Sequence, residues 1–242
     1  HFFNGPLNRD GQAPFARRNN VYDFAQPNDA YFAHVDYVLN LARSKGLLVL
    51  MTPAYLGFQG GQEGWWPEIN TAVNTEAVME NYGRYLGNRY RGFSNIVWVM
   101  GGDYYADATL TKTRAIVRGI QATDQARLFS AHNARYESGA LHYNAEPWFT
   151  LNTTYSDCSA TPGHLIGDYQ RAPTRPFVYI EGRYENENST TARCLRSQAY
   201  WPVLLGAVGS FFGNRPIWLF DPGWQTALDS TGARGMTYYG RL

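Results

Sequence analysis

The sequence predicts an α/β fold, a (β/α)8 TIM barrel in which this chain lacks the first one or two βα units. Three observations lead to this prediction. Short apolar runs rich in β-branched and aromatic residues alternate with helical patterns, which favours a parallel sheet with right-handed crossovers. The length of 242 residues is usual for one such domain. Two of the runs end on a carboxylate. We expect one barrel domain over residues 1–242, incomplete at its N-terminus.

The first part of the chain predicts one helix before any strand. Residues 1–28 contain Gly, Pro, Asn and Arg without a sustained period and predict a loop. A helix is expected from Asp29 to Gly46, followed by a buried strand over 47–52. A loop rich in Gly and Trp follows over 55–69, and the spacing of apolar residues predicts a helix over 74–91.

The rest of the chain continues the alternation of strands and helices. Further strands are expected over 95–101, 127–131, 148–152, 176–181 and 208–212. Helices are expected over 110–122, 190–206 and 224–230, with Pro202 kinking or ending the second of them. A long polar loop is expected before 176–181.

Six predicted strands are two fewer than a closed barrel requires. The deficit falls at the N-terminus, because the first predicted helix precedes the first predicted strand. An open doubly wound sheet is the rival fold. Gly-x-Gly-x-x-Gly follows none of the predicted strands, and the loop at Gly60-Gly61 does not match a phosphate-binding loop. No internal repeat or interdomain linker is visible.

Two strand ends carry the sequence's main chemical signal. The run beginning at Asn95 ends on Asp103, and the run beginning at Pro176 ends on Glu181. Barrels of this type keep their catalytic groups at the carboxyl ends of their strands. A pair of carboxyl groups suits the cleavage of a glycosidic bond. The alternative is structural, because an acid at a strand end often caps the next helix or pairs with a buried Arg.

Composition narrows the possible partners. Lys plus Arg number 21 against 20 Asp plus Glu, so no basic face is predicted and nucleic acid is not an expected partner. No apolar run approaches the 18 or so residues of a membrane span. The 7 Trp and 18 Tyr suit a carbohydrate substrate, because such rings stack on sugars and their polar tips bond hydroxyls. The histidines lack metal-ligand spacing, so neither a metal nor another cofactor is expected.

The two cysteines, Cys158 and Cys194, leave two alternatives open. They permit one disulfide, and the low Lys content with many Tyr, Asn and Thr fits a secreted or periplasmic protein. The other alternative is two free, buried thiols.

Several motifs together resemble the apiosidase-like glycoside hydrolases. The stretches 19–24 and 27–36, with Ala42 and Gly46-Leu47, are similar to that family's N-terminal part. Val97–Asp103 resembles its fourth-strand motif and Ile180–Glu185 its seventh-strand motif. The closing segment around Gly223-Trp224 and 228–233 is also similar. The resemblance covers about residues 19–235.

The resemblance implies a (β/α)8 barrel and a retaining mechanism. By position, Asp103 is the expected acid/base at strand four and Glu181 the expected nucleophile at strand seven. The first visible strand then corresponds to strand three, and strands one and two are not in this chain. A retaining pair has carboxyl groups about 5–5.5 Å apart, against roughly 6.5–9.5 Å for an inverting pair.

Residues near these strand ends are candidates for binding the substrate. His132 could bond a sugar hydroxyl, orient a carboxylate or bond the backbone. Tyr155 could bond the nucleophile or simply pack. Tyr184 flanks the loop after Glu181. The expected sugar platform is Trp65 and Trp66, and Trp224 is a similar candidate; the structural alternative is a loop anchored by its own aromatic rings.

Two further charged residues follow the seventh-strand motif. Glu185 is a rival nucleophile that we expect to be solvated, because it lies beyond the strand end. Arg183 could pair with Glu185 or recognise an acidic substrate.

Two functions from different classes follow. The first is a retaining glycoside hydrolase acting on a plant or microbial polysaccharide or oligosaccharide. The second is a non-catalytic barrel that binds glycans or serves as a structural subunit of an extracellular assembly. The pair Asp103 and Glu181 favours the first, and the missing strands favour the second.

Overall fold

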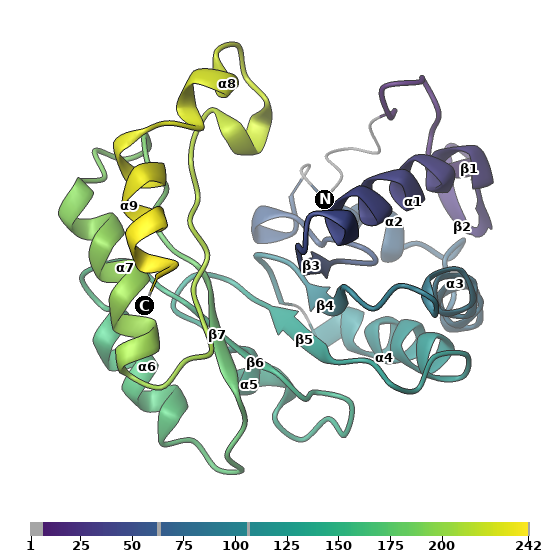
Figure 1. Cartoon of the computed structure of the whole chain (residues 1–242). Helices are drawn as coiled ribbons and strands as arrows, with labels where there is room; N and C mark the ends of the chain where they lie inside the picture. Colours follow the sequence, from purple (N-terminus) through teal and green to yellow (C-terminus); the bar gives the residue numbers. More distant parts are fainter. Residues whose placement is uncertain (1–6, 62–63, 106, 242) are drawn as a thin grey trace. The chain divides into compact units, whose positions relative to one another are not determined.

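The computed structural model describes residues 7–61, 64–105 and 107–241. The chain divides after Ala134 into two compact units. Each unit contains a parallel sheet and its own helices (Figure 1). The α/β class predicted from the sequence is therefore confirmed.

The first unit is built on a parallel sheet in the order β3-β4-β5. Its strands are β3 (Val49–Met51), β4 (Ile96–Gly101) and β5 (Phe129–His132). All six residues of β4 are buried, as expected for a central strand covered on both faces. These strands confirm the predictions for 47–52, 95–101 and 127–131 to within a few residues.

The helices of the first unit connect these strands. The predicted helices are found as α1 (Asp29–Ser44), α3 (Glu76–Tyr90) and α4 (Asp107–Gln121). A 3-10 turn η1 (Phe58–Gly60) and the short α2 (Trp66–Ile69) lie within the predicted loop. Glycines let α3 and α4 pack closely (Figure 1), because a Cβ on Gly119 would lie 2.0 Å from the carbonyl oxygen of Glu80.

The predicted loop over 1–28 is wrong for its second half. The structure forms an antiparallel hairpin of β1 (Phe15–Arg18) and β2 (Val21–Pro27); residues 1–6 lie outside the described part. Asn19 and Asn20 both adopt positive φ, 53° and 61°, which suits a two-residue hairpin turn. The Phe15 ring stacks on that of Phe24 at 4.2 Å between centroids.

The second unit contains the parallel pair β6 (Asn152–Tyr155) and β7 (Phe177–Glu181). The strand expected over 148–152 is found as β6, which begins only at Asn152. The expected strand over 208–212 is reduced to an isolated parallel bridge between Tyr179 and Ser210.

Helices make up most of the rest of the second unit. The expected helices over 190–206 and 224–230 appear as α7 (Ala192–Leu204) and the shorter α8 (Trp224–Ala227). Pro202 lies in the last turn of α7, near its end as expected. Four elements were not predicted: α5 (Gly139–Tyr143), α6 (Thr161–Tyr169), η2 (Ile217–Leu219) and α9 (Thr231–Tyr239). In Figure 1, α7 and α9 lie side by side.

The two cysteines form a disulfide. Cys158, after β6, is bonded to Cys194, in the first turn of α7, with a Cα–Cα distance of 5.2 Å. The bond closes a loop across 36 residues of sequence, and it decides between the two alternatives that the sequence left open.

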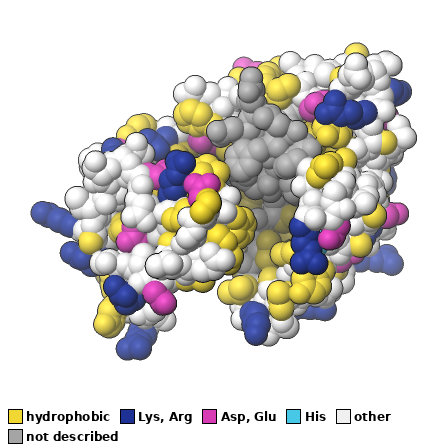
Figure 2. All heavy atoms as spheres, turned by 90° about the horizontal axis from the view of Figure 1, so that it is seen from above, with side chains coloured by type: hydrophobic (Ala, Val, Ile, Leu, Met, Phe, Trp, Pro, Cys, Tyr) yellow, Lys and Arg dark blue, Asp and Glu magenta, His cyan; other side chains and the backbone are white. Residues whose placement is uncertain are grey.

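Charged side chains and long apolar helices are the two features that bear on possible partners. Lys, Arg, Asp and Glu are interspersed among uncharged side chains on the face shown in Figure 2. Within 7–61, 64–105 and 107–241, no helix has the length and apolar content needed to cross a membrane.

Candidate active site

Asp103 follows the end of β4, in a sharp turn of the backbone. Gly101 and Gly102 have φ of 78° and 126°, and Asp103 itself has φ of 44°. Only glycine fits at 102, because a Cβ there would lie 2.1 Å from the ring of Tyr55. The turn leaves Asp103 8% exposed at the carboxyl end of the central strand.

His132, the last residue of β5, fixes the backbone of this turn. Its Nδ1 accepts a hydrogen bond from the Asp103 amide at 2.7 Å. Its carbonyl oxygen accepts another from the Gly102 amide at 2.8 Å. Since an amide N–H can only donate, Nδ1 is the acceptor, and the proton of a neutral ring is on Nε2. The structure shows a bond from His132 to backbone, and a contact of His132 with a sugar hydroxyl or a carboxylate stays a prediction.

The two adjacent tryptophans occupy different environments. Trp65 is 1% exposed and packs edge-on against Phe15, Tyr22 and Phe24, at centroid distances of 5.5 Å. The prediction that it forms a sugar platform is wrong, because a ring in the core offers no open face. Trp66 is only partly buried and meets the Tyr104 ring edge-on at 5.4 Å.

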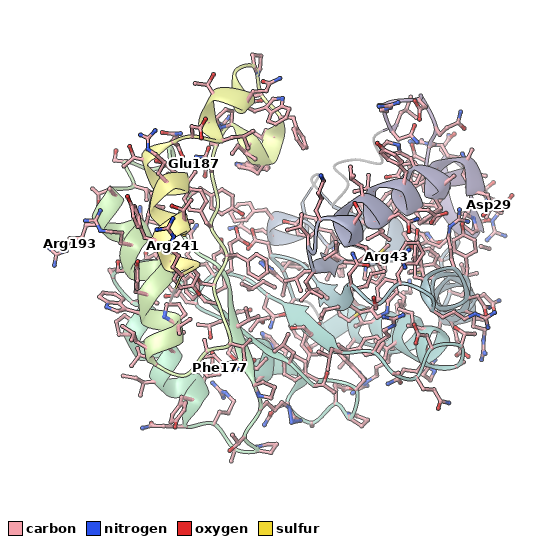
Figure 3. All side chains as sticks on the ribbon, viewed as in Figure 1. Asp29, Arg43, Phe177, Glu187, Arg193 and Arg241 are labelled. Carbon is pink, nitrogen blue, oxygen red and sulfur yellow. A yellow bond between two sulfur atoms is a disulfide. The ribbon has the colours of Figure 1, made fainter. Side chains whose placement is uncertain are left out.

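Glu181 ends β7 and is partly buried. Figure 3 labels Phe177, the first residue of β7, and Glu187, which lies six residues beyond the strand's last residue. The hydroxyl of Tyr184 donates a hydrogen bond to Oε1 of Glu181 at 2.9 Å. This bond orients the carboxylate and stabilises its ionised form, which a nucleophile requires.

Glu181 lines a cavity of about 260 Å³ within the second unit. Its lining consists of Ile180, Glu181, Gly182, Tyr184, Phe211, Phe212, Gly213, Asn214, Ile217 and Trp218. Aromatic rings beside a carboxylate suit a sugar, whose ring has apolar C–H faces and polar hydroxyls.

Sequence reasoning missed Trp218 as a lining residue of this cavity. Its indole N–H donates to Glu187 at 2.8 Å, and its ring meets that of Tyr184 edge-on at 6.2 Å. The signal available in the sequence was an apolar run over 217–220 after a proline. The lining includes Trp218 and not Trp224, which meets Phe220 edge-on at 5.3 Å. A substrate-binding role for Trp224 stays a prediction.

Tyr155 ends β6 beside Glu181, its partner in the register of the two strands. Its side chain is buried. Arg135 donates to the Tyr155 hydroxyl at 3.4 Å and lies 5.5 Å from the ring centroid. The neighbouring guanidinium therefore contributes to holding Tyr155 in place, and its suggested contact with the nucleophile stays a prediction.

The expectation that Glu185 is solvated is wrong. Its Oε1 accepts from the Gly232 amide at 2.8 Å, and its Oε2 accepts from Asn214 at 2.8 Å and from the Ser230 hydroxyl. Ser230 is the N-cap of α9. Glu185 therefore anchors the start of this helix.

Arg183 forms an ion pair with Asp157, whereas the sequence suggested Glu185 as its partner. Its guanidinium lies 3.5 Å from Oδ2 of Asp157, which also accepts from the Tyr136 hydroxyl at 2.6 Å. Burial of Asp157 opposes its ionisation, but hydrogen bonds from Ser159 and Tyr136 outweigh this and hold its pKa well below the usual range.

Metal ligands do not gather in the part of the chain that the structure describes. No group of three or more His, Cys, Asp or Glu side chains there is placed to hold a metal ion.

Comparisons with known proteins agree with this architecture. A structure described as "Glycoside hydrolase" matches with a TM-score of 0.82 and 22% identity, over 100% of this chain and 61% of that one. A glycoside hydrolase family 5 structure from Bacteroides vulgatus ATCC 8482 matches with a TM-score of 0.81 and 21% identity, over 99% and 58%. A putative glycoside hydrolase from the same strain gives 0.60 and 16%, over 86% and 39%.

These likenesses show the fold, and the chain spans about three fifths of the length of the first two structures. No curated protein matches the chain. The model of the apiosidase-like catalytic domain matches residues 4–242. The resemblance predicted from the sequence motifs is thereby confirmed, and the chain belongs to the apiosidase-like family of glycoside hydrolase catalytic domains.

Proposed function

We propose that the chain is the catalytic domain of a retaining glycoside hydrolase acting on a plant or microbial polysaccharide or oligosaccharide. Glu181 acts as the nucleophile and Asp103 as the acid/base. The observation that carries the proposal is that each carboxylate lies at the C-terminal end of a parallel strand and has a positioning partner. Tyr184 bonds the Glu181 side chain, and His132 bonds the Asp103 backbone.

The proposed reaction has two displacement steps. Glu181 attacks the anomeric carbon and forms a glycosyl ester, while Asp103 donates its proton to the leaving oxygen. In the second step Asp103 takes a proton from water, and this water releases the sugar from Glu181. The sugar bound next to Glu181 is expected to contact the aromatic lining of the 260 Å³ cavity.

The finer fold and the location of the protein belong to the same proposal. We assign β4 and β7 to the fourth and seventh strands of a (β/α)8 barrel, following the family's motifs. The Cys158–Cys194 disulfide supports a secreted or periplasmic location, because such bonds persist in oxidising compartments.

A substrate screen with matched variants tests the proposal. Aryl glycosides and pectic oligosaccharides would be incubated with wild type, Glu181→Gln and Asp103→Asn. Asn tolerates positive φ as Asp does, so the second substitution removes the acid without straining the turn. We expect each variant to lose at least about a hundredfold in kcat on the substrate that wild type cleaves. Equal turnover by wild type and Glu181→Gln would refute the assignment of the nucleophile, and binding without turnover by wild type would favour a glycan-binding barrel.

A further inference from the structure

The ring of Tyr184 lies directly against the backbone of Gly213. A Cβ built on Gly213 would lie 2.4 Å from Cδ1 of Tyr184 and 2.6 Å from its Cγ and Cε1. Contacts this short are not tolerated between heavy atoms, so any other residue at 213 displaces either the ring or the backbone.

The backbone on both sides is held by a ladder of hydrogen bonds. The Glu185 amide donates to the Gly213 carbonyl at 2.9 Å, and the Arg215 amide donates to the Glu185 carbonyl at 3.0 Å. The Glu185 side chain also bonds that of Asn214 at 2.8 Å. Because residues 213–215 cannot separate easily from residues 184–186, the ring of Tyr184 is the part that moves.

Movement of this ring reaches Glu181. The Tyr184 hydroxyl is at the far end of the ring and donates to Oε1 of Glu181 at 2.9 Å. Relieving the contact with a methyl group requires a ring shift of about 1 Å, which lengthens or misaligns the hydrogen bond from the hydroxyl. The edge of Trp218 lies against the same ring and limits the directions in which it can move.

We propose that Gly213 is a positioning residue: it leaves space for the Tyr184 ring and thereby keeps the Tyr184 hydroxyl on the Glu181 carboxylate. The inference rests on the proposed role of Glu181 as the nucleophile. It adds a residue outside the proposed catalytic pair, in the same cavity lining, whose lack of a side chain keeps that carboxylate hydrogen-bonded and oriented.

The chain offers a matched control. Neither Gly213 nor Gly209 has positive φ, so alanine fits the backbone conformation at both positions. A Cβ on Gly209 meets no heavy atom within 4 Å. Gly213→Ala and Gly209→Ala therefore make the same chemical change in one segment, and only the first creates a contact with Tyr184.

The test measures the Glu181 carboxyl group directly. Glu side-chain carboxyl ¹³C signals would be followed through a pH titration in wild type, Gly213→Ala, Gly209→Ala and Tyr184→Phe, with Glu181→Gln to assign the signal. Loss of a hydrogen bond to the ionised carboxylate raises its pKa. We expect Gly213→Ala to raise the Glu181 pKa as much as Tyr184→Phe does, and Gly209→Ala to match wild type. Where a substrate is known, kcat/KM falls roughly tenfold in the first two, and its acidic limb moves to higher pH.

The titration needs no turnover, so it separates this inference from the proposed function. If no glycoside is cleaved but the titrations behave as expected, the nucleophile assignment fails while Gly213 still positions Tyr184. A Glu181 pKa in Gly213→Ala equal to that in Gly209→Ala overturns the inference. Should Gly213→Ala not fold, the substitution would be repeated in a Tyr184→Ala background. Recovery of folding there supports the contact with the ring, and continued failure overturns it.

Discussion

The backbone amide of Asp103 donates a hydrogen bond to Nδ1 of His132 at 2.7 Å, which joins the turn after β4 to the end of β5. The bond lies at a position of positive φ that few residues adopt, so the turn depends on its partners. His132 therefore acts on the proposed acid/base through the backbone that carries it.

His132→Leu removes the acceptor and leaves the Asp103 amide without it. We expect kcat to fall roughly tenfold or more, because an unsatisfied buried donor costs about 1–3 kcal/mol. His132→Asn places its Oδ1 near the position of Nδ1 and should retain most of the activity. Steady-state kinetics of the two variants checks this, and equal losses in both would show that the acceptor is not what matters.

Alanine substitutions of Trp65 and Trp66 should affect different properties, the first stability and the second substrate binding. Trp65→Ala removes a ring from the core and is expected to lower the free energy of unfolding by about 3–5 kcal/mol. Trp66→Ala should change this free energy much less and raise KM for an oligosaccharide. Urea unfolding and steady-state kinetics measure the two effects. A large KM change with unaltered stability in Trp65→Ala would contradict its place in the core.

The Cys158–Cys194 disulfide is expected to stabilise the second unit by about 2–4 kcal/mol through the loop that it closes. Thermal unfolding with and without dithiothreitol measures this. Wild type should lose stability on reduction. The double variant with Cys158→Ser and Cys194→Ser should be less stable from the start, and dithiothreitol should change its stability little. An unfolding temperature of wild type that dithiothreitol leaves unchanged would contradict the presence of this disulfide.

The lowered pKa of Asp157 predicts that the free energy of unfolding depends on pH. Its side chain is 5% exposed, and its hydrogen bonds depress its pKa in the folded state. The stabilisation is therefore present above the unfolded-state pKa of about 3.9 and is lost as the pH falls below it. Asp157→Asn removes this contribution, so the stability gap between wild type and variant should shrink between pH 6 and pH 3. A gap that is constant over this range would contradict the prediction.

The elements that hold Asp103 and Glu181 could be predicted from the sequence. β4 and β7 are short apolar runs, and their enrichment in β-branched and aromatic residues favours a strand over a buried helix segment. The hairpin β1–β2 was missed because its turn, Asn19-Asn20, depends on two consecutive positive φ values rather than on Gly or Pro.

The side chains around the carboxylates were harder to predict. Trp65 and Trp66 are adjacent and chemically identical, so only packing distinguishes a core ring from a partly exposed one. Trp218 reaches Tyr184 because residues 213–215 pair with residues 184–186, a long-range pairing that no local pattern indicates. The position of Glu185 beyond the strand end predicts a solvated side chain, and its partners, Asn214 and Ser230, are too distant in sequence for any local pattern to indicate them.

The central claim is that Glu181 forms the covalent bond to the sugar, and a mechanism-based label tests it most directly. A 2-deoxy-2-fluoro glycoside of the sugar found in the screen would be incubated with the enzyme, and the labelled peptide located by mass spectrometry after proteolysis. We predict one sugar per chain, attached to Glu181, and no label in Glu181→Gln. A label on Glu185 or another carboxylate, or rapid turnover with an inverted product and no label, would contradict the account.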